Sequence, residues 1–156
     1  MTEAISNLEQ PTISPQQSPV DPQGKATVLL LPIKSALQKG LSIYEATRAA
    51  WRFSNNICGV LEANKAIAVG VVDNVAVGVF DLIALDKIEG TNKYSFTGNE
   101  LKGHELLNKD FGLITSRAGS WQRGNYLVIK FYGNGTYKYL YGHAQQEAYF
   151  DLTAVN

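Results

Sequence analysis

The feature that most constrains the fold is a long apolar hairpin predicted between Lys65 and Leu85. Its strands, KAIAVGVV and VAVGVFDLIAL, meet at Asp73-Asn74, and both of these residue types tolerate the positive φ of a two-residue turn. Residues on both faces of the strands are apolar, whereas a strand with one face in water alternates apolar and polar residues. The hairpin must therefore be covered on both sides by other elements of a small domain.

A two-residue turn also predicts the register of this hairpin. It pairs Val71 with Ala76 and sets Val69 opposite Gly78, so that large residues face small ones. We therefore expect a larger side chain at Gly78 to crowd Val69.

A helix is predicted to begin at Ser42. Ser42 and Glu45 form a capping box, in which each side chain satisfies a free backbone N–H of the first turn. The alanines that follow favour helix, and Arg48 and Arg52 complement the C-terminal end of the helix dipole. We expect one continuous helix that ends at Asn55-Asn56.

Composition narrows the class of protein. The 156 residues suit one domain, and 14 basic residues balance 14 acidic ones, which argues against tight non-specific binding to duplex DNA. Cys58 is the single cysteine, so an internal disulfide is excluded and a reducing, cytoplasmic location is expected. Neither a membrane-length apolar stretch nor a secretory signal pattern is found, so no membrane partner is expected.

Two segments of different composition are distinguished. Residues 1–24 hold four prolines and four glutamines with few large apolar side chains, and are expected to form a disordered tail. Residues 25–156 are expected to form a single α+β domain. Its predicted core is a small, mostly antiparallel, barrel-like sheet of five to six strands, with the Ser42 helix packed on it and a further helix over Asn99 to Leu107.

The last predicted hairpin, YLVIKFYGNGTYKYLYG, has Asn134-Gly135 at its turn, a strong hairpin signal. A two-residue turn places Lys130 and Tyr132 on one face together with Tyr137, Tyr139 and Tyr141. Aromatic rings interleaved with basic residues form a platform on which bases stack. The alternative is a cross-strand tyrosine ladder that packs against another part of the chain.

The motifs IYEATRAAWRF, AIAVGVVDNVAVGVF and YSFTG resemble a group of small prokaryotic domains with a Y-x-A-T-R-x-x-W-R helix. These domains are similar to the PUA, ASCH and EVE-like superfamily, and the resemblance covers Leu41 to Tyr132. It implies a PUA-like barrel that holds RNA, or a modified base in DNA, in a cleft beside the sheet.

Motifs that would indicate catalysis are weak. Glu100-Leu101-Lys102 matches half of a nuclease metal site, but no Pro-Asp precedes it. His104, His143 and Cys58 are too few for a zinc site, and the glycines show neither Walker nor G-x-G-x-x-G spacing. We therefore predict no catalytic residue, no metal and no cofactor, and an enzyme is the least favoured class.

The predicted function is a non-catalytic module that binds RNA, single-stranded DNA or a modified base. The cleft would lie between the Ser42 helix and the Gly112–Asn125 loop, with arginines on phosphates and aromatic rings on bases. The candidate ligand-binding residues are Tyr44, Arg48, Trp51, Arg52, Arg117, Trp121, Arg123, Lys130, Tyr132 and Tyr139. The alternative function is a protein-interaction adaptor that uses the tyrosine face and the N-terminal tail.

Overall fold

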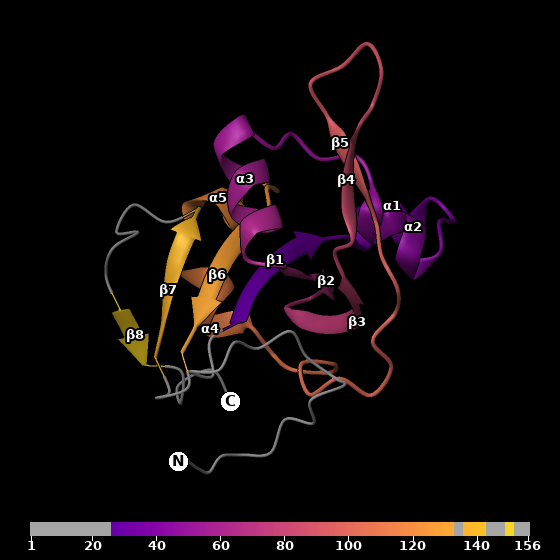
Figure 1. Ribbon diagram of the computed structural model, residues 1–156. Coiled ribbons are helices and arrows are strands. Elements are labelled where there is room, and N and C mark those ends of the chain that lie inside the picture. The colour runs from indigo at the N-terminus through magenta and orange to yellow at the C-terminus, as the bar shows by residue number, and fades with distance from the viewer. Residues whose placement is uncertain (1–25, 133–135, 143–148, 152–156) are drawn as a thin grey trace.

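A mixed six-stranded sheet is the centre of the domain in the computed structural model, which describes residues 26–132, 136–142 and 149–151 (Figure 1). In spatial order its strands are β3 (Val75–Asp81), β2 (Ile67–Val72), β1 (Ala26–Pro32), β6 (Leu127–Phe131), β7 (Thr136–Tyr141) and β8 (Tyr149–Asp151). β1 and β2 are parallel, and the other neighbours are antiparallel. The α+β class is confirmed. In the described residues the sheet is open, with β3 and β8 at its two ends, so the predicted barrel-like sheet is not seen to close. The predicted tail lies outside the described residues.

Helices and a small second sheet cover the two faces of the main sheet (Figure 1). One face carries α1 (Lys34–Gln38), α2 (Ile43–Arg48), α3 (Asn55–Ala63) and the two-stranded sheet of β4 (Ala84–Lys87) and β5 (Tyr94–Thr97). The other face carries α4 (Gly112–Ser116) and α5 (Gly119–Gln122). None of the helices in these described ranges has the length and apolar character needed to cross a membrane.

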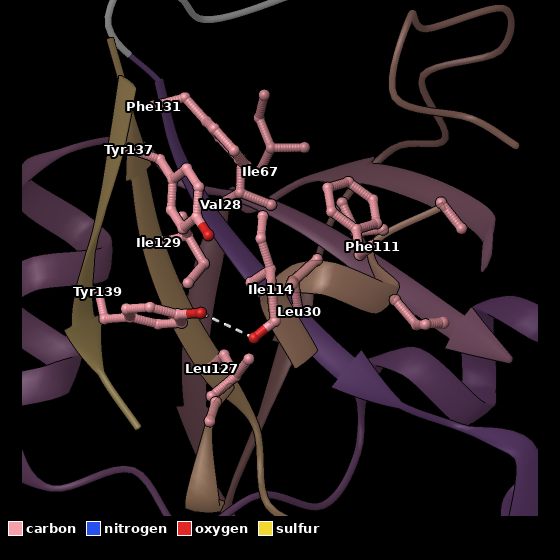
Figure 2. Close-up of a cluster of buried hydrophobic side chains, with 14 of the residues drawn as sticks. Val28, Leu30, Ile67, Phe111, Ile114, Leu127, Ile129, Phe131, Tyr137 and Tyr139 are labelled. Carbon is pink, nitrogen blue, oxygen red and sulfur yellow. Dashed lines mark hydrogen bonds between the residues drawn. The ribbon is translucent and has the colours of Figure 1, made fainter. Parts of the chain in front are cut away.

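The described residues form two hydrophobic cores, one on each face of the sheet. Strand β1 supplies both of them: Val28 and Leu30 point into the core under α4, and Leu29 and Leu31 point into the core under α3. All four side chains are fully buried. We call these the α4 core, part of which Figure 2 shows, and the α3 core. The prediction that the apolar hairpin is covered on both sides is confirmed, because β2 and β3 contribute to both cores.

The helix predicted from Ser42 to Asn55-Asn56 is too long: α2 ends at Arg48, and a separate helix, α3, begins at Asn55, where the predicted helix was to end. Its start is confirmed, since the Ser42 hydroxyl accepts a hydrogen bond from the backbone N–H of Glu45 at 3.1 Å. The chain becomes extended after Arg48, despite the alanines that favour helix. Trp51 forms a β-bridge with Tyr94 instead, with backbone hydrogen bonds of 2.9 and 2.7 Å. A second N-cap at Ser54 then begins α3.

The register of the apolar hairpin is correct at its turn and shifted beyond it. Asp73 and Asn74 adopt positive φ as expected, and the predicted pairs next to this turn are found. A register shift at Gly70/Val71 then sets Gly70 opposite Gly78. The predicted contact of Gly78 with Val69 is therefore wrong.

This pair of glycines lets helix α2 lie close to the sheet. A Cβ built at Gly70 would be 2.5 Å from Thr47 Oγ1 and 2.7 Å from Ile33 Cδ1. A Cβ at Gly78 would be 2.6 Å from Ile43 Cγ2. Any side chain at these positions would force α2 away from β2 and β3.

A strap formed by residues 99–110 covers the outer edge of β3. The backbone N–H of Leu101 donates to the Val79 carbonyl at 2.8 Å, and the N–H of Ala76 donates to the Lys109 carbonyl at 3.0 Å. These bonds occupy part of an edge that would otherwise be open to pairing with another chain. The helix predicted over Asn99 to Leu107 is therefore wrong, because this segment satisfies its backbone partly on β3.

We predict that Gly70→Ala destabilises the domain by about 1–3 kcal/mol, because the new methyl group overpacks against α2. Gly59→Ala is the matched control. Gly59 lies exposed within α3 with no atom within 4 Å of a built Cβ, so alanine there should stabilise the helix by about 0.5–1 kcal/mol. Chemical denaturation of both variants measures the difference. Equal unfolding free energies of the Gly70→Ala and Gly59→Ala variants would contradict the close packing of α2 on the sheet.

Candidate nucleic-acid interface

Tyr44 and Arg48, two predicted ligand-binding residues, join α2 to β5. The Arg48 Nε donates to the Phe96 carbonyl at 2.9 Å, and its Nη1 donates to Glu45 Oε1 at 3.4 Å. The Arg48 guanidinium lies 5.6 Å from the centre of the Tyr44 ring. The Tyr44 hydroxyl accepts a hydrogen bond from the Gly98 N–H at 3.2 Å. Both side chains therefore have a structural role.

Trp51 and Arg52 lie in the extended segment between α2 and α3. The half-buried Trp51 packs on the α3 core, and its indole N–H donates to the Thr47 carbonyl at 2.8 Å. The Arg52 side chain is exposed, and its backbone carbonyl accepts a hydrogen bond from the Tyr126 hydroxyl at 3.0 Å. Arg52 is therefore held beside the start of β6 with its guanidinium facing solvent.

Arg117, Trp121 and Arg123 lie on the opposite side of the sheet. The segment that contains them, predicted as a loop, forms the short helices α4 and α5. Trp121 packs against the α4 core, and Arg117 Nη1 lies 3.5 Å from the Tyr137 hydroxyl, to which it donates. Because α2 packs over the α3 core, the sheet separates the two groups (Figure 1). The predicted cleft between the Ser42 helix and the Gly112–Asn125 segment is not formed.

The last hairpin has a different register from the predicted one. Phe131 pairs with Tyr137, and Ile129 pairs with Tyr139. The backbone N–H of Tyr132 donates to the Thr136 carbonyl at 2.9 Å, so three residues separate the strands, not two. The predicted turn at Asn134-Gly135 lies outside the described residues. The predicted register is wrong by one residue, so Tyr137 and Tyr139 lie on the face of the sheet opposite to the predicted one.

Tyr137 and Tyr139 are fully buried in the α4 core, as Figure 2 shows. The Tyr139 hydroxyl donates to the Ile114 carbonyl of α4 at 2.7 Å. Burial, followed by the neighbouring Tyr137, raises the pKa of Tyr139 above its ordinary value. The prediction that Tyr139 stacks on a base is therefore wrong, and so is the tyrosine surface expected for an adaptor. The alternative of a packed tyrosine ladder is closer to the structure.

The opposite face of this hairpin brings two lysines together. Lys130 and Lys138 are directly paired across β6 and β7, and both are half-buried. The Lys130 Nζ lies 5.9 Å from the centre of the half-buried Tyr132 ring. Beyond these lysines the register shifts again, so that Tyr141 is paired with Val128. We call this surface the hairpin face, and its residues are Lys130, Tyr132, Lys138, Leu140 and Tyr141.

Charge is distributed unevenly along the chain. Residues 111–146 hold four of the 14 basic residues and none of the 14 acidic ones. The four are Arg117, Arg123, Lys130 and Lys138. The zero net charge of the chain therefore conceals a basic segment, which contains α4, α5, β6 and β7.

His104 is a buried polar residue in the strap. Its side chain is 3% exposed, and its Nδ1 accepts a hydrogen bond from the Leu106 N–H at 3.1 Å. The proton of the neutral ring therefore lies on Nε2, which has no hydrogen-bond partner among the described residues. Burial lowers the pKa of His104, because a charged imidazolium would lose its hydration.

The described residues offer little for catalysis. They contain no group of three or more His, Cys, Asp or Glu that could hold a metal ion. Burial raises the pKa of Cys58, which disfavours the thiolate that nucleophilic chemistry needs.

Comparison with known proteins gives no match to a family model, to a curated protein or to a solved structure.

We predict that Arg48→Ala destabilises the domain by about 1.5–3 kcal/mol, the usual range for a hydrogen bond made by a charged group. Arg52→Ala, four residues away with an exposed side chain, should change stability by less than about 0.5 kcal/mol. Thermal and denaturant unfolding of the two variants measures this difference. Similar stabilities would show that Arg48 does not join α2 to β5.

A second prediction concerns pH. The unfolded chain protonates His104 near its ordinary pKa of 6.5, whereas the folded domain resists protonation because its pKa is lowered. The unfolding free energy should therefore fall as the pH drops below about 6.5. His104→Asn keeps an acceptor for the Leu106 N–H without titrating, so its stability should fall less from pH 7 to about pH 5. Parallel stability profiles would contradict the lowered pKa.

Proposed function

We propose that this protein binds nucleic acid through the hairpin face, with Lys130 and Lys138 contacting backbone phosphates. The observation that carries the proposal is the direct pairing of these two lysines on one half-buried face. Like charges that face each other across two strands destabilise a sheet. A phosphate between them would be attracted by both ammonium groups.

The surroundings of the hairpin face support the same ligand. The absence of acidic residues from residues 111–146 leaves a basic segment, which favours a polyanion. At the start of β6, the exposed Arg52 adjoins Tyr126 through its carbonyl, on the side of the sheet that carries Leu140 and Tyr141. Arg52 would extend the phosphate-binding surface beyond the lysines.

The resemblance of the Tyr44–Arg52 motif to PUA, ASCH and EVE-like domains supports this proposal, since those domains hold RNA or a modified DNA base. We propose the same ligand class for this chain, on a different surface from the cleft that the resemblance implied. An adaptor role is less favoured, because Tyr137 and Tyr139, which it required on the surface, are in the α4 core.

Salt-dependent binding tests the proposal. We expect the wild type to bind fluorescein-labelled single-stranded RNA and DNA at low salt, as measured by fluorescence anisotropy. Lys130→Gln and Lys138→Gln should each weaken binding several-fold and reduce the slope of log K against log salt by about 0.7. Each variant removes one phosphate contact, so the slope reports its loss.

Lys39→Gln is the matched control, because Lys39 is an exposed lysine at the end of α1 and lies outside the basic segment 111–146. It should bind as the wild type does. Failure of the wild type to bind at low salt, or equal losses in all three variants, would overturn the proposal.

A further inference from the structure

We infer that the hairpin face takes an extended single strand rather than a duplex. One base stacks on Tyr132, another stacks on Tyr141, and the phosphates between them lie over the Lys130 and Lys138 pair. This inference rests on the proposed function and specifies its ligand.

The register of β6 and β7 sets the spacing of these groups. Tyr132 is hydrogen-bonded to Thr136, Lys130 is paired with Lys138, and Tyr141 is paired with Val128. Positions 132, 130 and 128 follow one another at intervals of two residues on the same face of β6. At about 3.3 Å per residue, the backbone positions of Tyr132 and of Val128, the partner of Tyr141, are about 13 Å apart along the strand, with the lysines midway.

This spacing favours an extended strand. Bases in a duplex rise by about 3.4 Å per step, and each base face is covered by the next base. A tyrosine on a sheet can stack only on a base whose face is free, as in an unpaired, splayed strand. Two free bases separated by about 13 Å leave phosphates between them, where the lysines lie.

The rings of Tyr141 and Tyr132 have different neighbours. Tyr141 stacks on Tyr126 with ring centres 4.9 Å apart, and the buried Tyr126 is in turn hydrogen-bonded to the Arg52 carbonyl. Tyr141 is therefore held in place before a ligand arrives, which lowers the entropic cost of binding. Tyr132 lies beside Lys130, so a base on this ring would place its phosphate near the ammonium group.

The register shift in β7 makes this arrangement possible. Tyr139 and Tyr141 would share one face in a regular strand, because side chains alternate. The shift places Leu140 and Tyr141 together opposite Val128, on the face that carries the lysines. The strand thus buries Tyr139 in the α4 core while Tyr141 lies on the hairpin face.

The test compares three ligands: a single-stranded oligonucleotide, a duplex of the same sequence, and a strand of equal length without bases. Tyr132→Ala should weaken binding of the single strand by about 5- to 150-fold, the usual effect of losing one stacked base. It should leave the affinities for the duplex and for the baseless strand unchanged. Tyr132→Phe keeps the ring and should bind all three as the wild type does, which controls for changes in folding.

The outcomes separate this inference from the proposed function. If the lysine variants weaken binding while Tyr132→Ala weakens all three ligands equally or none, the strand geometry is wrong and the lysine site remains. If the wild type binds none of the ligands at low salt, the proposed function itself fails. Selective loss of the single strand with Tyr132→Ala, restored by Tyr132→Phe, supports the inference.

Discussion

Side chains alternate between the faces of a strand, so a shift of one residue in register moves a side chain between two environments. This constraint acts in both antiparallel hairpins of the main sheet. In the first, a shift at Gly70/Val71 pairs Gly70 with Gly78 and opens the space in which α2 lies. In the second, a shift in β7 leaves Tyr139 in the core and places Tyr141 beside the lysines. The position of α2 on the sheet and the candidate interface therefore both depend on the register of the strands.

Burial of both sheet faces limits where the proposed interface can lie. Helices α1 to α3 and the small sheet cover one face, and α4 and α5 cover the other, so most large side chains of the described strands are buried. At the end of the first face, β6 and β7 present the half-buried Lys130 and Lys138 in place of core residues. Arg48, which lies nearer β5, has its polar atoms engaged by Phe96 and Glu45. Binding and structural roles are thus separated in space.

Features set by local interactions could be predicted from the sequence. The Ser42 cap depends on residues three apart, and the turn at Asp73-Asn74 depends on two adjacent residues, so both were correct. Contacts between distant residues could not be predicted. Trp51 leaves the expected helix to pair with Tyr94, and Tyr139 is buried because its hydroxyl reaches Ile114. Lys130 and Tyr132 were correctly placed on one face, but their partners across the hairpin were not.

The most direct test of the central claim is to map the ligand contacts residue by residue. A short single-stranded oligonucleotide would be titrated into ¹⁵N-labelled protein, and the backbone amide shifts followed by NMR. The proposed interface predicts that the largest changes fall at Lys130, Tyr132, Lys138 and Tyr141, with little change in α2. Changes centred on Tyr44 and Arg48, or no changes at low salt, would contradict it.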